Sequence, residues 1–247
     1  MLTEERLHKI LRLVAERGSV STQELMDTLD ISESTVRRDL TTLDEQGMIS
    51  KVRGGAMVKE DKYSTVEATM MQKKDLNLEE KRVIARYAAS LLQENDFVFL
   101  DAGSTTELMI DYITEKKVTF VTNAVAHAKK LSQKGYTTYI LGGEFKATTE
   151  AIVGDETVAG LQKYNFTKGF WGTNGVNRKV GFTTPDVKEA MVKKTAMEHC
   201  AKRYVLCDTS KFSQISSVKF ADFANAFIIT TELEDDNYAH CENIIQV

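Results

Sequence analysis

Small and hydroxyl-bearing side chains follow an apolar run near the middle of the chain. Residues 97–100 are apolar, and the next residues read Asp101-Ala102-Gly103-Ser104-Thr105-Thr106. The free N–H groups at the start of a helix carry partial positive charge, and with neighbouring hydroxyls they can hold a phosphate group. Asp101 would then bond the hydroxyls of an attached sugar. Ser104 and Glu107 also have the spacing of a capping box, which would account for this pair without a ligand.

Similar small or polar residues end three further apolar runs: Thr122-Asn123, Gly142-Gly143 and Gly172-Thr173-Asn174-Gly175. Glycine lets a ligand approach the backbone closely, although Asn and Gly are also ordinary turn residues. Two lysines could add positive charge for a phosphate or could be solvated surface residues: Lys188, and Lys211 in the segment that starts at Asp208. Ligands of open α/β sheets bind beyond the carboxyl ends of the strands, so these positions predict one shared anion site.

A parallel sheet is needed to bring these positions together. Apolar runs alternate with helical patterns after residue 78, at 97–100, 118–121, 138–141, 169–172, 204–207 and 227–230. Short apolar runs separated by helices are typical of buried parallel strands. We therefore expect a Rossmann-like α/β domain over residues 78–247. The polar stretch 58–77 lacks clear periodicity and is predicted to be a linker.

Residues 1–57 predict three short helices and a hairpin. The first helix has an apolar stripe and ends at Gly18, and the second starts with the capping box of Ser21 and Glu24. The third takes Ser32 or Ser34 as its N-cap and stops at Gly47. Residues 49–53 alternate apolar and polar side chains, which predicts a short strand before a glycine turn.

The third predicted helix separates its side chains into two faces. Val36, Leu40 and Leu43 share one side, and the other side and its flanks carry hydroxyls and two arginines: Ser34, Thr35, Arg37, Arg38 and Thr41. A DNA major groove admits one helix, and arginine can bond guanine through two N–H groups. Lys51 and Arg53 would form a basic wing suited to phosphates. The alternative is a solvated polar face that closes a helical bundle. Asp39 is acidic on this helix and would orient Arg37 or Arg38 or act as a cap.

Composition excludes several classes of protein. Residues 1–60 hold nine Lys+Arg against eleven Asp+Glu, and the whole chain has a net charge of −4, so DNA binding rests on the placement of charge. The three cysteines form no C-x-x-C pair, so we expect no metal, no cofactor, no disulfide framework and a reducing cytoplasm. No apolar run is long enough for a membrane helix, and no signal peptide is expected at the N-terminus.

Two groups of these motifs resemble the DeoR family of bacterial transcription regulators. In the first 57 residues they are Ser32-Glu33-Ser34-Thr35-Val36-Arg37-Arg38-Asp39-Leu40, Leu43, Gly47 and Arg53-Gly54-Gly55-Ala56. In the remainder they are Glu80-Lys81, Ile84-Ala85, the 101–106 loop, Thr122-Asn123, Gly142-Gly143, Gly154 and residues 208–212. The resemblance implies a winged helix-turn-helix in which Ser34, Thr35, Arg37 and Arg38 touch the operator.

The resemblance also implies an effector domain similar in fold to ribose-5-phosphate isomerases and coenzyme A transferases, which senses phosphorylated sugars. An isomerase-like Asp-Gly-Ala-Asp stretch is replaced by Leu141-Gly142-Gly143-Glu144, which favours binding without catalysis. Because the sequence looks most like regulators of fructose or lactose phosphotransferase operons, fructose 1-phosphate is the first expected effector and tagatose 6-phosphate the second.

The expected function is therefore a transcriptional regulator of sugar metabolism, most often a repressor in this family, that is not an enzyme. Its expected partners are double-stranded operator DNA, a phosphorylated sugar and further copies of itself in a homodimer or homotetramer, because palindromic sites need a two-fold assembly. Two alternatives are a sugar-phosphate isomerase or transferase with a helical head, and a winged helix that binds another protein.

Overall fold

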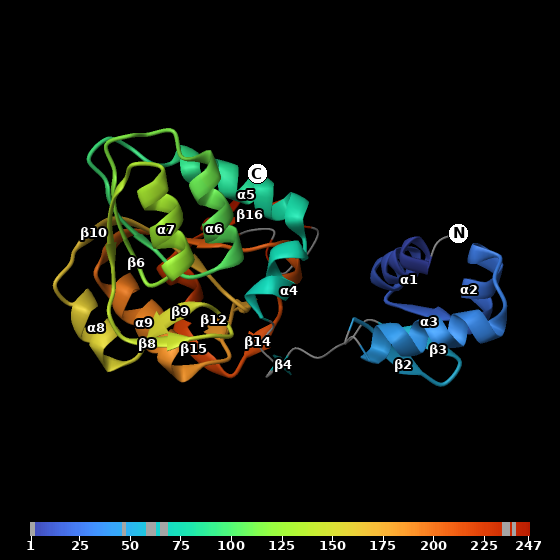
Figure 1. The fold of residues 1–247 in the computed structure, drawn as a ribbon. Coiled ribbons are helices and arrows are strands. Elements are labelled where there is room, and N and C mark those ends of the chain that lie inside the picture. The colour runs from blue at the N-terminus through green and yellow to red at the C-terminus, as the bar shows by residue number, and fades with distance from the viewer. Residues whose placement is uncertain (1–2, 46–47, 58–62, 65–68, 234–237, 239–240) are drawn as a thin grey trace. The chain divides into compact units, whose positions relative to one another are not determined.

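A computed structural model of the chain describes residues 3–45, 48–57, 63–64, 69–233, 238 and 241–247. The chain forms two compact units, residues 1–61 (the head) and residues 62–247 (the C-terminal unit), as Figure 1 shows. Each unit has its own hydrophobic core. Among the described residues, no helix is long and apolar enough to cross a membrane.

The head consists of three helices and a small antiparallel sheet. Its elements in order are α1 (Thr3–Arg17), β1 (Ser19–Ser21), α2 (Thr22–Leu29), α3 (Glu33–Glu45), β2 (Ser50–Val52) and β3 (Gly55–Met57). The strand order is β1-β3-β2. The sequence did not predict β1, which pairs with β3 at a close approach: a Cβ on Gly55 would lie 2.2 Å from the carbonyl oxygen of Val20. The hairpin of β2 and β3 is the predicted wing.

The helix boundaries of the head follow local signals. The residue after α1 is Gly18, whose φ of +75° suits glycine. The capping box of Ser21 and Glu24 at the start of α2 is confirmed. Ser32 accepts a hydrogen bond from the N–H of Thr35 at the start of α3. Gly47, the predicted end of that helix, lies outside the described residues.

The C-terminal unit is built on a seven-stranded sheet of order β17-β16-β13-β10-β5-β6-β7. All of its pairings are parallel. The strands are β5 (Phe97–Leu100), β6 (Thr119–Thr122), β7 (Thr137–Ile140), β10 (Phe166–Gly172), β13 (Cys200–Leu206), β16 (Phe227–Thr230) and β17 (Ile244–Gln246). The six predicted strands are thus confirmed, with small shifts at their ends. β17 was not predicted, because a short run near a chain end gives little pattern.

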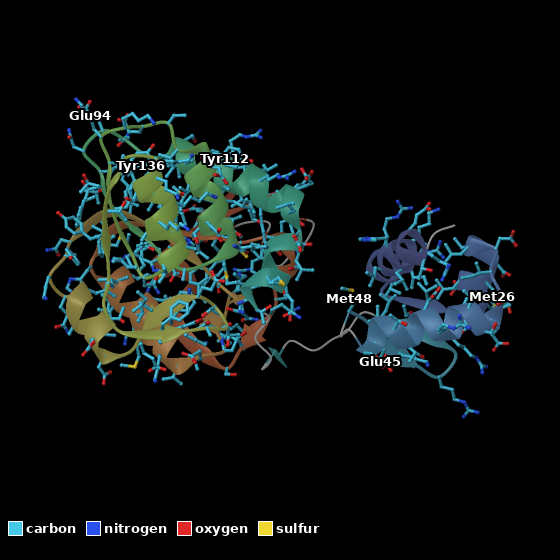
Figure 2. All side chains as sticks on the ribbon, in the orientation of Figure 1. Met26, Glu45, Met48, Glu94, Tyr112 and Tyr136 are labelled. Carbon is cyan, nitrogen blue, oxygen red and sulfur yellow. The ribbon has the colours of Figure 1, made fainter. Side chains whose placement is uncertain are left out.

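Helices cover both faces of this sheet. The helices are α5 (Leu78–Ser90), α6 (Ser104–Tyr112), α7 (Val125–Gln133), α8 (Asp155–Leu161) and α9 (Val187–Glu198). Side chains alternate along β5, so Val98 and Leu100 pack with α5, α6 and α7, whereas Phe99 packs with α8 and α9. Figure 2 shows Tyr112 and Tyr136 on the side of α6 and α7, where Tyr136 packs edge-on against Phe120. The Rossmann-like α/β domain predicted from the sequence is thus confirmed.

Smaller strands and 3₁₀ turns complete the C-terminal unit. They are the sheet of β11 (Gly175–Asn177), β12 (Gly181–Thr184) and β15 (Val218–Ala221), the hairpin of β8 (Glu144–Lys146) and β9 (Ala151–Val153), β14 (Ile215–Ser216), η1 (Thr209–Lys211) and η2 (Phe223–Asn225).

The expected linker, residues 58–77, contains structure where it is described. It includes β4 (Tyr63–Ser64), which pairs with β14, and α4 (Met70–Asp75). The Thr69 side chain caps α4, and Met70 is buried against the C-terminal unit. The polar composition of this segment hid both elements, because one buried methionine in a six-residue helix leaves no periodic pattern.

Candidate functional site

The exposed face of α3 is the candidate DNA-binding surface. Val36, Leu40 and Leu43 are buried in the head core, and Ser34, Arg37 and Arg38 are exposed on the other side. Thr35 and Thr41 are partly buried at its margins. The helical period thus directs the two arginines and the hydroxyls outward together.

The two arginines of this surface differ in their neighbours. Arg37 forms an ion pair with Glu33 at 2.5 Å, one helical turn earlier. The Arg38 guanidinium forms no ion pair or hydrogen bond with another described residue, and the Arg38 carbonyl accepts from Thr42 Oγ1 at 3.1 Å. The Arg38 guanidinium is therefore available for an external contact, whereas that of Arg37 is engaged by a carboxylate.

The wing is hydrogen-bonded to α3. The Lys51 ammonium donates to Thr41 Oγ1 at 2.6 Å, and the Lys51 N–H donates to Asp44 Oδ1 at 3.0 Å. Arg53 lies exposed beside the turn at Gly54. Lys51 and Arg53 thus flank the recognition helix from the hairpin.

Asp39 is buried and has a structural partner. The Arg6 guanidinium of α1 donates to both of its carboxylate oxygens, at 2.5 and 3.0 Å. Asp39 therefore does not orient Arg37 or Arg38 and is not a cap, contrary to the sequence interpretation. It fixes α3 against α1, across 33 residues of sequence that hide the pair from local reasoning.

A second candidate site is a pocket of about 70 Å³ at the carboxyl ends of β5, β10 and β13 in the C-terminal unit. The residues that line it and were predicted are Gly103, Ser104, Thr105, Asn174, Asp208 and Lys211. The lining also includes charged and hydroxyl groups that were not predicted: Lys73, Lys81, Thr149, Glu189 and Lys193. A signal for two of these was present in the sequence, because Glu189 and Lys193 are one helical turn apart and share a face of α9.

The N-terminus of α6 opens into this pocket. Ser104 is the first residue of the helix, and Gly103 is its N-cap without a side-chain hydrogen bond. The predicted capping box of Ser104 and Glu107 is therefore wrong; Glu107 instead pairs with Lys74 at 3.0 Å. The first N–H groups of α6 are left without a capping side chain, which suits them to an anionic ligand.

Asp101 lies behind the pocket and is held by Lys193. The Asp101 carboxylate is buried and accepts hydrogen bonds from the Lys193 ammonium and, at 3.1 Å, from the N–H of Gly172. Burial raises the pKa of Asp101, and the adjacent ammonium opposes that shift. Asp101 thus positions Lys193 at the pocket, a different role from the predicted contact with a sugar.

Three further predicted residues support the pocket loop from behind. Thr122 Oγ1 donates to the carbonyl of Leu100 at 2.6 Å, and Asn123 Oδ1 accepts from the N–H of Ala102 at 3.0 Å. Thr106 Oγ1 donates to the carbonyl of Asp101 at 2.7 Å and lies 3.0 Å from His127 Nε2. All three side chains are buried and hold the backbone of the loop.

The remaining predicted residues lie away from the pocket lining. The carbonyl of Gly142 accepts from Thr157 Oγ1 at 2.9 Å, and a Cβ on Gly143, whose φ is +144°, would lie 2.1 Å from that same oxygen. Both glycines thus serve the packing of α8. Lys188 is exposed and pairs with Glu144 beside a separate groove.

The charges around the pocket leave a positive excess. Four lining lysines face two lining carboxylates, Glu189 and Asp208, and one of the lysines, Lys193, is also paired with the buried Asp101, which leaves a formal excess of one positive charge. Glu189 is already bonded to Lys146 at 3.2 Å and to Thr149. The pKa of Lys81 is lowered, mainly by burial. The negative charge of Asp208 opposes this shift, and the positive charge of Lys211 adds to it. A phosphate monoester carries about −1.5 to −2 at neutral pH, opposite in sign to this excess.

Both parts of the chain match known protein families. The profile of the DeoR-like helix-turn-helix domain matches residues 6–62, and that of the DeoR C terminal sensor domain matches residues 76–232. The HTH-type transcriptional regulator FruR of Bacillus subtilis is 44% identical over 242 residues, 96% of each chain. The lactose phosphotransferase system repressor of Streptococcus mutans is 33% identical and covers 96% of this chain and 95% of its own.

Matches among solved structures have low identity and low TM-scores. Ribose 5-phosphate isomerase A of Methanocaldococcus jannaschii has a TM-score of 0.40 at 17% identity and covers 55% of each chain. The delta subunit of eIF2B from Chaetomium thermophilum has a TM-score of 0.41 at 17% identity and covers 62% of this chain and 60% of that chain.

The matches decide between the three interpretations of the sequence. The relatives that span nearly the whole chain are transcriptional regulators with a DNA-binding domain, so the chain is a regulator and not a sugar-phosphate enzyme. The helix-turn-helix domain implies a DNA partner, and the sensor domain implies an effector. The chain belongs to the DeoR family of transcriptional regulators.

Proposed function

We propose that this regulator represses a sugar phosphotransferase operon and that a phosphorylated sugar, with fructose 1-phosphate as the first candidate, controls its binding to the operator. The observation that carries the proposal is the pocket at the N-terminus of α6, where four lysines meet uncapped helix N–H groups. The names of the relatives, FruR and lactose phosphotransferase system repressors, agree with this class of operon.

The effector contacts follow from the pocket lining. The phosphate lies at Ser104 and Thr105, with Lys81 and Lys211 as its cations. Asn174, Thr149 and Lys193 face the sugar hydroxyls, because they line the same space on the side of β10 and α9. Asp101, Thr106, Thr122 and Asn123 hold this arrangement from behind.

On the head, Arg38 reads a base edge in the major groove, and Ser34, Thr35 and Thr41 contact bases or phosphates beside it. Lys51 and Arg53 contact the backbone from the wing, and Arg37 joins them when it exchanges Glu33 for a phosphate. Since one recognition helix reads few base pairs, the chain binds a palindromic operator as a homodimer or homotetramer.

The first test is thermal unfolding of the full chain against a panel of sugar phosphates, with the parent sugars as controls. A ligand at about 100 times its Kd adds about 2.7 kcal/mol of stability, which shifts the Tm by several degrees. A shift with fructose 1-phosphate and none with fructose would support the proposal. No shift with any sugar phosphate would contradict it.

A further inference from the structure

The described residues 63–64 and 69–77 follow the helix-turn-helix match, which ends at residue 62, and reach the start of the sensor match at residue 76. Met70, Lys73 and Leu76 of this stretch line the pocket. β4 pairs in parallel with β14, and α4 supplies Met70 and Lys73 to the pocket lining. The helix α4, which precedes the bulk of the sensor match along the chain, is therefore part of the wall of the candidate effector pocket.

Polar contacts with described residues position α4. The N–H of Met70 donates to the carbonyl of Thr148 at 3.1 Å, and Lys74 pairs with Glu107 of α6 at 3.0 Å. After the helix, Asn77 Nδ2 donates to Asp208 Oδ1 at 2.9 Å. A six-residue helix with one buried side chain is marginal by itself, so these contacts decide its position.

Lys81 connects α4 to the pocket. The last four carbonyls of any helix lack partners within it, and in α4 the Lys81 ammonium donates to one of them, that of Lys73. An ammonium has three N–H donors, so Lys81 can keep this bond and also hold an anion. Lys73 itself lines the pocket and brings a second cation on the helix.

The pocket is small in this structure. Its volume of about 70 Å³ is well below the range of about 300–1,000 Å³ for small-molecule sites. Most of the other walls are strand ends and helices of the sheet layers, joined by the turn at Thr149 and by η1, whereas α4 contributes one buried side chain, Met70, to the described structure. Among the helices of the wall, α4 is therefore the one that a ligand displaces at the lowest cost in buried apolar surface.

We infer that residues 69–77 form a lid that opens for the effector and closes on its phosphate. In the closed position Lys73 of the lid and Lys81 of α5 both contact the phosphate. Because the lid precedes the sensor domain in the sequence, its closure couples effector binding to the head. The inference rests on the proposed function. It assigns a phosphate contact to Lys73 and gives α4 two positions, one of which the ligand stabilises.

Hydrogen exchange of the full chain tests the lid directly. With saturating fructose 1-phosphate, amides in residues 69–77 are expected to exchange more slowly, and with fructose they should be unchanged. If the melting assay shows binding but exchange in 69–77 does not slow, the lid is wrong and the proposed function stands. If no sugar phosphate gives a melting shift, the proposed function and the lid both fail.

A charge reversal outside the pocket lining tests the coupling. Lys74→Glu removes the contact with Glu107, and the double variant Lys74→Glu/Glu107→Lys restores it in reverse. The ratio of operator affinities with and without fructose 1-phosphate should fall about fivefold in the single variant and recover in the double. Lys117→Glu, which breaks the exposed pair with Glu94, is the matched control and should keep the ratio. An unchanged ratio in Lys74→Glu, or no recovery in the double variant, would overturn the coupling.

Discussion

The head and the C-terminal unit place their candidate functional side chains in opposite ways. The head presents them outward from a single helix and its neighbouring hairpin, over a core that uses other residues. The C-terminal unit collects its pocket from residues up to 141 positions apart in the sequence, from Met70 to Lys211, and buries several of the charges in pairs. Substitutions on the head surface should therefore change binding alone, whereas substitutions in the pocket should also change stability.

The largest effect is expected from Lys193→Met. This change leaves the Asp101 carboxylate buried without its cation, which lowers the free energy of unfolding by about 3–5 kcal/mol. Urea unfolding followed by circular dichroism measures the loss. The double variant Lys193→Met/Asp101→Asn should recover most of it, because the buried charge is gone. A single variant as stable as the wild type would show that Asp101 is not a buried partner of Lys193.

Ser104→Asp separates binding from stability within the pocket. A carboxylate at the N-terminus of α6 suits the helix but repels a phosphate, so the fold should persist and the affinity for fructose 1-phosphate should fall about a hundredfold. Isothermal titration calorimetry measures the affinity, with Ser104→Ala as the control that removes the hydroxyl only. If Ser104→Asp binds as tightly as Ser104→Ala, the phosphate does not lie at this helix.

Arg38→Ala tests the opposite behaviour in the head. Loss of a two-bond contact with a base should weaken operator binding by about 2 kcal/mol, or about thirtyfold, while the Tm and effector affinity stay constant. Arg37→Ala should have a smaller effect on operator affinity, because Arg37 is already in an ion pair with Glu33. Fluorescence anisotropy with labelled operator DNA gives both values. Equal operator affinity for Arg38→Ala and the wild type would remove Arg38 from the interface.

As the pH falls below neutral, the free energy of unfolding of the C-terminal unit should decrease because His127 is buried. Burial is the main reason that the pKa of His127 is lowered to about 3, and the nearby Lys130 and Lys74 lower it further. The ring is therefore neutral in the folded unit. The unfolded chain binds a proton near pH 6.5, so stability falls as pH drops from about 6.5 towards 3, by about 2 kcal/mol at pH 5. His127→Gln should flatten this dependence in urea unfolding between pH 7 and 5. The head's His8 is exposed, and His8→Gln serves as the control.

The same contrast explains what the sequence could predict. On the head, the period of a helix separates Val36, Leu40 and Leu43 from Arg38 without any tertiary information. The role of Asp39 escaped prediction because its partner, Arg6, lies on another helix. The sequence pattern of a helix thus predicts which of its faces is buried, but it does not predict which side chains bond across two helices.

In the C-terminal unit, strand-end chemistry predicted the location of the pocket better than its lining. Ser104 and Lys211 line it, but Thr122 and Asn123, which have the same residue chemistry at neighbouring strand ends, bond the loop backbone. The residue type does not show whether a hydroxyl or amide faces a ligand or a carbonyl. Lys81 and Lys193 reach the pocket from helices, and only the packing of those helices on the sheet reveals it.

The most direct test of the account is a titration of fructose 1-phosphate into the complex of the full chain with operator DNA, selected from a random pool by the chain itself. Fluorescence anisotropy follows the DNA, with the wild type and Ser104→Asp side by side. The account predicts that operator affinity of the wild type changes at least about fivefold with fructose 1-phosphate, does not change with fructose, and does not change with either in Ser104→Asp. An equal response in both proteins, or no response of the wild type to any sugar phosphate, would contradict it.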